Sequence, residues 1–142
     1  MATQQDVREY AQAIQAELSS IVTPIPVYAN FNRNYATQPK FITWQLRDVH
    51  QPVYTGNVQS IKGIDTPVFQ ISVFTQEMAD GFDTSNDILQ ALHGFSGTFG
   101  GGGHSFNVSK ADVVWLYHGY DNEIGLHNIF MDCTLYLSLI HI

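Results

Sequence analysis

Histidine and cysteine are the side chains of this sequence that could hold a metal ion or act as a nucleophile. None of the histidines has the HxxxH or HxH spacing of a metal site, and the single Cys133 brings no second thiolate ligand. The best remaining pair is His118 with His127, which could face each other across the last predicted hairpin. We therefore expect no metal site. The histidines considered are His50, His93, His104, His118 and His127.

Cys133 would need a neighbouring base to act as a nucleophile. His127 lies six residues earlier on the same predicted strand, where the two side chains would share a face but lie ~20 Å apart. Cys133 is therefore expected to be a small core residue. A lone cysteine cannot form an internal disulfide, so an oxidising compartment is not indicated.

The glycine run FSGTFGGGG invites comparison with a phosphate-binding loop. Gly97 and Gly102 have the GxxxxGK[ST] spacing, but Gly103 stands where the lysine is needed. The run also follows a predicted helix instead of leading from a strand into one. GFSG at residues 94–97 is not a GxSxG nucleophile elbow. We expect a flexible loop over residues 97–109.

Carboxylates gather in two places, and neither needs an acid–base role. Asp80, Asp83 and Asp87 form one cluster, in which Asp83 or Asp87 suits the start of a helix. Asp121 and Glu123 form the other, and Asp121 with Asn122 suits a turn. The sequon at residues 107–109 has no meaning without a secretory signal. The sequence thus predicts no catalytic, cofactor-binding or metal-binding residue, no cofactor and no enzymatic activity.

The helices and strands that would position these residues are predicted from the spacing of hydrophobic residues and from residues such as proline that interrupt regular structure. A first helix is predicted over residues 3–19, with Thr3 and Asp6 as a capping box. Proline residues then lead into an extended piece. Residues 48–62 are expected to be a hairpin connection or long loop. Strands are predicted over residues 27–30, 41–46, 66–75, 112–117 and 125–137, with a turn over 119–123.

A second helix is predicted over residues 78–93. Its apolar stripe is Met78, Phe82, Ser85, Leu89 and Leu92, and Gly94 suits a C-cap with positive φ. Because Gly81 weakens a helix, Thr84 with Asp87 offers a second possible start.

The order of elements is α-β-β-β-α-β-β, without an internal repeat or interdomain linker. It predicts one α+β domain over residues 1–142, with two helices on one face of a largely antiparallel, mixed sheet of about five strands. The last strand should place Ile129, Met131, Cys133 and Leu135 on one face.

Composition limits the partners. The formal net charge is −7, which argues against phosphate-dominated nucleic-acid binding, although DNA could slide past an acidic wall. Charged residues make up only 13%, so the surface must be covered by polar uncharged and aromatic side chains. Such a surface predicts an oligomer. Neither a signal peptide nor a membrane span is predicted.

The last residues, LSLIHI at 137–142, match the translation of a common sequencing adapter in one frame. They are expected to be an assembly scar, with a natural continuation of the last strand as the alternative.

Taken together, these segments resemble the tail-terminator, or tail-completion, family of long-tailed bacteriophages. The resemblance covers residues 26–136. The order and spacing of its segments carry it, from an N-terminal helix to VFQISVFTQ, ADGFDTSNDILQALHGFSGTFGG and DVVWLYHGYDNEIGLHNIFMDCTLYL.

The resemblance implies a structural virion protein that forms a ring, usually of six copies, at the head-proximal end of the tail tube. Such a ring ends tube polymerisation and joins the tail to the head or neck. The implied partners are copies of itself, the tail tube protein and a head–tail connector or neck protein. DNA would pass through the lumen without specific binding. The protein would be made in the host cytoplasm and reside in the virion.

Two segments are candidates for contacts between subunits or with tube and neck, namely residues 48–62 and 97–109. Ordinary surface loops are the alternative for both. Two other functional classes stay open: another virion protein, such as a neck adaptor or tube subunit, and a small ligand-binding α+β domain.

Overall fold

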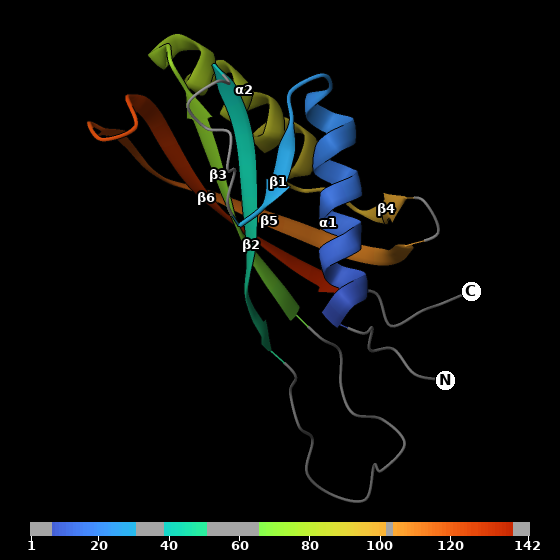
Figure 1. Cartoon of the computed structure of the whole chain (residues 1–142). Coiled ribbons are helices and arrows are strands. Elements are labelled where there is room, and N and C mark those ends of the chain that lie inside the picture. Colours follow the sequence, from blue (N-terminus) through green and yellow to red (C-terminus); the bar gives the residue numbers. More distant parts are fainter. Residues whose placement is uncertain (1–6, 31–38, 51–65, 102–103, 138–142) are drawn as a thin grey trace, which may run out of the picture.

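The computed structural model describes residues 7–30, 39–50, 66–101 and 104–137, which form two helices and one six-stranded sheet (Figure 1). The helices are α1 (Val7–Val22) and α2 (Met78–Leu92). The strands are β1 (Val27–Ala29), β2 (Lys40–His50), β3 (Thr66–Thr75), β4 (Gly97–Gly101), β5 (His104–Asp121) and β6 (Leu126–Leu137). The predicted α+β class is confirmed, with six strands instead of about five.

The sheet has the order β1-β2-β3-β6-β5-β4 and is mixed. β1 runs parallel to β2, and every other neighbouring pair is antiparallel. The strands twist strongly, so that β5 and β6 cross the direction of β2 and β3 in Figure 1.

Both helices pack on one face of this sheet, and the register of the central strands supplies the core beneath them. Ile42 of β2 lies opposite Val73 of β3, and Val73 lies opposite Ile129 of β6. The predicted face of the last strand is confirmed, because Ile129, Met131, Cys133 and Leu135 are all buried. A register slip of one residue would turn this whole row away from the helices.

The first predicted helix is confirmed as α1, which continues to Val22, beyond the predicted end at residue 19. Tyr10, Ile14 and Leu18 are completely buried. The Tyr10 ring meets Phe106 of β5 edge-on, with 5.3 Å between ring centroids. The proposed capping box lies outside the described residues.

α2 buries only part of the predicted stripe, because Ser85 and Leu92 are buried but the other three residues are not. Met78 and Phe82 are 48% and 39% exposed, and Leu89 is only partly buried. The difference arises at Gly81, where a Cβ atom would lie 2.9 Å from Thr75 Oγ1, so the glycine lets the helix approach β3 closely. The buried residues are Gly81, Thr84, Ser85, Ile88 and Leu92.

The ends of α2 test two predictions. The helix begins after Glu77, which makes no side-chain capping bond, so a start at Thr84 was wrong. Gly94 has φ +80°, which confirms the predicted positive-φ position after the helix.

The glycine-rich segment is where the prediction failed most clearly. Residues 97–101 are strand β4, and β5 begins at His104, so the expected loop over 97–109 is mostly a hairpin. Phe99 is completely buried and stacks on Phe106 of the facing strand at 5.7 Å. The Gly100 N–H donates to the Glu17 carboxylate of α1 at 2.9 Å. An aromatic anchor and this bond therefore hold a sequence that local propensity assigns to a loop.

β3 has the predicted bounds, whereas β2 and β5 are longer than predicted. Residues 48–50 continue β2, so this part of the expected connection over 48–62 is strand, and residues 51–62 lie outside the described part. β5 extends to Asp121, so the predicted turn over 119–123 was placed too early. Asp121 Oδ1 accepts a bond from the Glu123 N–H, as the turn chemistry predicted. β6 ends at the buried Leu137.

Candidate assembly surface

The predicted approach of His118 and His127 is confirmed. His118 Nε2 lies 3.2 Å from His127 Nδ1, and the two rings are nearly parallel. This contact ties β5 to β6 near the end of their hairpin. Among the described residues, no group of three or more potential ligands could hold a metal ion. The pair therefore has a sufficient explanation as a cross-strand hydrogen bond.

Cys133 has the environment of an inert thiol. It is completely buried, opposite Phe69 on one side and Val113 on the other. Burial, with smaller contributions from Asp112 and Asp132, raises the pKa of the Cys133 thiol to about 12. The core role predicted for this residue is confirmed, and the thiolate that a nucleophile needs is disfavoured.

The carboxylate groups do not converge on a site. Asp80, Asp83 and Asp87 lie exposed on α2, with Asp80 in its first turn. Asp132 of β6 instead pairs with Arg47 of β2, across β3, and this partner raises the pKa of the Arg47 guanidinium. The α2 aspartates are therefore solvent-exposed helix charges, and the Arg47–Asp132 pair links β2 to β6 across β3.

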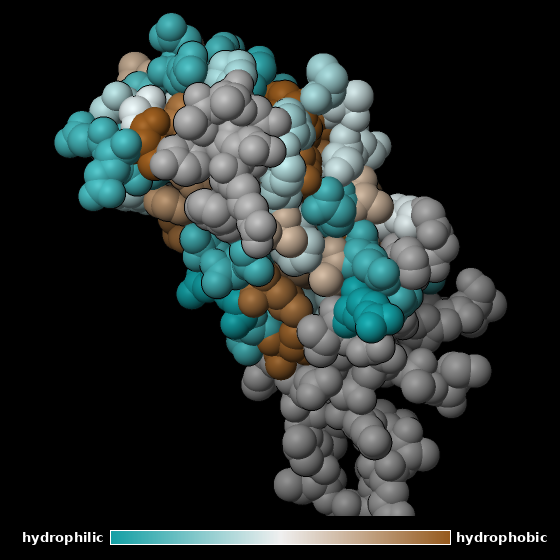
Figure 2. Space-filling model, viewed as in Figure 1, coloured by the Kyte–Doolittle hydropathy of each residue, from teal (hydrophilic) through white to brown (hydrophobic). Residues whose placement is uncertain are grey.

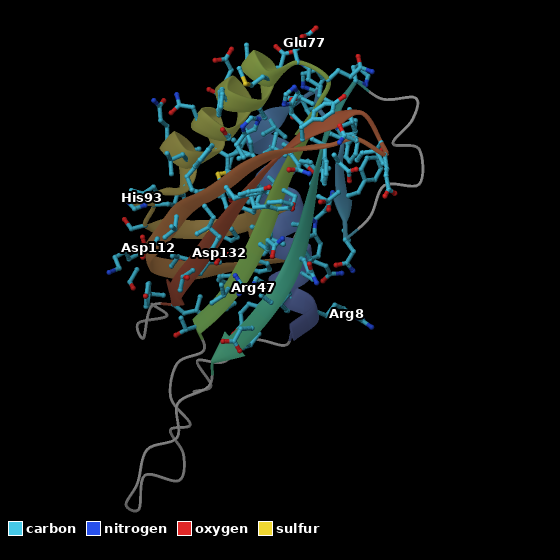
Figure 3. All side chains as sticks on the ribbon, turned by 90° about the vertical axis from the view of Figure 1, so that its left-hand side faces the viewer. Arg8, Arg47, Glu77, His93, Asp112 and Asp132 are labelled. Atoms are coloured by element: carbon cyan, nitrogen blue, oxygen red, sulfur yellow. The ribbon has the colours of Figure 1, made fainter. Side chains whose placement is uncertain are left out.

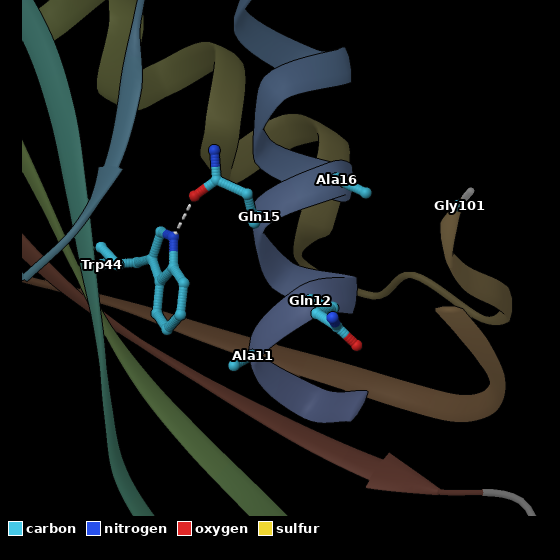
Figure 4. A pocket seen from close by; sticks show the side chains of 7 residues that line it. Ala11, Gln12, Gln15, Ala16, Trp44 and Gly101 are labelled. Carbon is cyan, nitrogen blue, oxygen red and sulfur yellow. Dashed lines mark hydrogen bonds between the residues drawn. The ribbon is translucent and has the colours of Figure 1, made fainter. Parts of the chain in front are cut away.

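One open groove lies beside α1 and has a volume of about 480 Å³ (Figure 4). The Trp44 Nε1–H donates to Gln15 Oε1 at 2.6 Å, and Gln15 Nε2 donates to the Val27 carbonyl at 3.0 Å. The groove contains amides and an indole but neither a charged group nor a nucleophile. Its lining residues are Ala11, Gln12, Gln15, Ala16, Ala29, Trp44 and Gly101.

Large aromatic and aliphatic side chains are exposed along the second half of β5 and at the beginning of α2. We call this surface the β5 patch, and it consists of Met78, Phe82, Val114, Trp115, Leu116, Tyr117 and Tyr120, each between 38% and 56% exposed. Four of these residues are consecutive, so the strand presents apolar side chains on both of its faces. Elsewhere, on the face shown in Figure 2, apolar atoms reach the surface only in separate places among hydrophilic ones.

Contacts hold the β5 patch in a defined shape. The Phe82 ring of α2 lies 6.1 Å from Trp115 and 5.0 Å from His118. The Trp115 Nε1–H donates to Ser85 Oγ at 3.2 Å, and Tyr117 stacks on Phe130 at 5.8 Å. The patch is therefore preorganised for contact with another surface.

The backbone beside the β5 patch forms an open edge. β4 pairs with β5 only as far as Val108. Ala111 then bonds to Gly94 and Phe95, and the Val113 N–H donates to His93 Nδ1. From Val114 to Asp121, no described strand pairs with this side of β5.

Sequence reasoning placed the contact surfaces elsewhere. Of its two candidates, residues 48–62 fall mostly outside the described part, and the described residues within 97–109 belong to β4 and to the beginning of β5, at the other end of that strand. The signal for the β5 patch was the run VVWLY, which lacks the alternation of a strand with one solvent face.

Charge is distributed unevenly between the two sides of the molecule. Three of the four described Lys and Arg side chains, Arg8, Lys40 and Arg47, lie on α1 and β2. In Figure 3, Asp112 and His93 lie on one side and Arg8 on the opposite side. The α2 and β5 side, including the turn after β5, has Lys110 against the carboxylates Glu77, Asp80, Asp83, Asp87, Asp112, Asp121 and Glu123.

Comparison with known proteins shows related folds. No family model and no curated protein sequence matches the chain. A chain in the virion of a native gene transfer agent particle is 15% identical, with a TM-score of 0.53, over 89% of this chain and 92% of its own. The sheath/tube terminator of an extracellular contractile injection system, in its extended state, is 11% identical, with a TM-score of 0.53, over 97% of this chain.

This chain spans 58% of that sheath/tube terminator. A third solved chain is 12% identical with a TM-score of 0.55, over 97% of this chain and 99% of its own. At such identities the comparisons show a shared fold alone, and at that level they agree with the resemblance to tail-terminator proteins. Neither described helix is long and apolar enough to cross a membrane.

Proposed function

We propose that this chain is a structural protein of a phage-like particle and acts as its tail terminator. The observation that carries the proposal is the fold shared with a sheath/tube terminator over 97% of the chain. The likeness to a chain of a gene transfer agent virion supports the same class of assembly. This fold by itself is compatible with many functions, so the surface must supply the second argument.

The β5 patch is that second argument. Seven large apolar side chains beside an open strand edge favour lasting contact with protein. The described residues lack the convergent charged groups or ligand clusters that would favour catalysis. A non-enzymatic assembly role therefore fits the surface best.

In this role the protein forms a ring at the head-proximal end of the tail tube. The ring stops tube polymerisation and offers its other side to a neck or connector protein. Six copies are expected, and DNA passes through the lumen. The net charge of −7 supports a channel to which DNA does not adhere.

The proposal is tested by electron microscopy of the purified protein, alone and with tail tubes assembled from the tube protein of the same particle. A terminator is expected to give single closed rings and to bind one end of each tube. Long tubes formed by the protein alone would instead identify a tube subunit. Rings that bind the neck but leave tube length unchanged would identify a neck adaptor.

A further inference from the structure

We propose that the outer edge of β5 from Val114 to Asp121, together with the β5 patch, binds the β2 edge of a second copy of this chain by extending the sheet. The β2 edge is defined as residues 45–50, on the side of β2 that faces away from β3. This inference rests on the proposed ring, and it names the surface by which one copy recognises the next.

The two edges are complementary in backbone. β1 pairs with β2 only from Ile42 to Trp44, so no described strand pairs with residues 45–50 on that side. β5 is open from Val114 to Asp121. Within the described ranges, each edge therefore presents N–H and C=O groups that pair with no other strand, and a six-residue overlap would align them over ~20 Å.

Large apolar side chains at the β5 edge remain partly exposed to water, because the described residues do not bury them. Leu116 sits at the register shift between Trp115 and Tyr117 and is 50% exposed. Tyr117 is 56% exposed although its ring stacks on Phe130. Strand addition at this edge would remove these groups from water while the added backbone satisfies the edge.

Charge selects the β2 edge over a second β5 edge. Two β5 edges placed together would bring two acidic surfaces into contact, including Asp112, Asp121 and Glu123 of each copy. The β2 side carries Arg8, Lys40 and Arg47 against Glu9, Glu17 and Asp48, and Arg47 is already paired with Asp132. It is therefore close to neutral and would repel the acidic β5 side less than a second β5 side would. Joining the β5 edge of one copy to the β2 edge of the next is a head-to-tail interface, which gives a ring when the rotation between copies closes and an open filament when it does not.

The test uses two variants and the parent chain, with association measured by sedimentation velocity and native mass spectrometry. Leu116→Lys places a charge at the β5 edge and is expected to weaken self-association more than ~100-fold. Tyr136→Lys is the control, because Tyr136 is a comparably exposed aromatic near the other end of the same strand pair. It should associate like the parent.

The second variant, Gln45→Glu with Arg47→Gln, makes the β2 edge more negative and should also be monomeric. Its control makes the same net change elsewhere, with Gln70→Glu on β3, opposite Gln45, and Lys110→Gln on β5. Thermal unfolding verifies that each variant is folded. Leu116→Gln replaces Leu116→Lys if the lysine variant does not fold.

Mixing the two monomeric variants gives the sharpest result. Each keeps one intact edge, so the head-to-tail model expects a 1:1 heterodimer that grows no further. A β2 variant that assembles like the parent would overturn the inference, as would a folded Leu116→Lys that still forms rings; both outcomes leave the proposed ring intact. A parent chain that stays monomeric at high concentration would instead overturn the ring itself.

Discussion

At the scale of single residues, Gly81 shows how one missing side chain places a helix. The backbone of α2 comes so close to β3 that a Cβ atom would lie 2.9 Å from Thr75 Oγ1 and 3.2 Å from Ile129 Cδ1. The sequence reading treated this glycine as a weakness of the helix. The structure shows that it is required for the contact between the helix and the sheet.

Gly81→Ala is therefore expected to destabilise the protein by about 1–3 kcal/mol, although alanine favours helices by up to about 1 kcal/mol. Gly101→Ala is the matched control, because its added Cβ would meet Ala16 Cβ at an ordinary 3.9 Å. The control should stay within about 0.5 kcal/mol of the parent in urea unfolding. Equal stability of the two variants would contradict the proposed packing role of Gly81.

Cys133 gives a prediction about pH. Burial raises the pKa of the Cys133 thiol from an ordinary 9.0 to about 12, so above pH 9 the unfolded chain loses the thiol proton more readily than the folded one. The contribution of this residue to stability is complete below pH 9 and is lost as the pH rises toward 12. The slope of unfolding free energy against pH over this range should be shallower in Cys133→Ala. An identical slope would show that the thiol is not protected.

Thiol labelling offers an independent measurement of the same residue. At pH 8 the folded protein should react with iodoacetamide far more slowly than the chain in urea, because the thiolate and the access it needs are both disfavoured. Rapid labelling under native conditions would contradict the burial of Cys133.

At the scale of elements, α2 shows which part of a helix a sequence can predict. The spacing predicted its existence and both ends to within about a residue. The buried face was displaced because it depends on where Gly81 touches β3. Ile88 is completely buried, whereas Leu89, assigned to the predicted stripe, is partly buried.

Ile88→Ala should therefore cost about 2–4 kcal/mol, and Leu89→Ala less than half of that loss. Urea titrations with both variants and the parent measure the difference, provided that the slopes of the transitions agree. A larger loss of unfolding free energy for Leu89→Ala than for Ile88→Ala would instead support the stripe predicted from the sequence.

β4 shows the opposite case, in which an element escapes local prediction. Four consecutive glycines over residues 100–103 indicate a loop. The strand depends on Phe99 in the core and on the bond from Gly100 to Glu17 of α1, and neither contact can be read from neighbouring residues. Predicting β4 required knowledge that α1 lies beside it.

At the scale of the whole molecule, the sequence predicted the fold class and the mixed sheet better than it predicted the surface. The β5 patch escaped because exposure depends on which side of β5 lacks a neighbour. The run VVWLY indicates only that both faces of a strand are apolar. The same pattern is found in a strand that is buried inside its own domain and in a strand that is buried only when another chain binds.

The order of the sheet also has a consequence for biosynthesis. Every pairing within β1-β2-β3 and within β6-β5-β4 joins segments of one half of the chain, whereas β3 with β6 joins the two halves. On the ribosome, the first three strands would therefore wait with one side of β3 uncovered until β6 has been translated. Contacts so distant in sequence form slowly. We therefore expect that the unpaired edge of β3 must be protected during synthesis. The chain can assemble only after β3 has paired with β6.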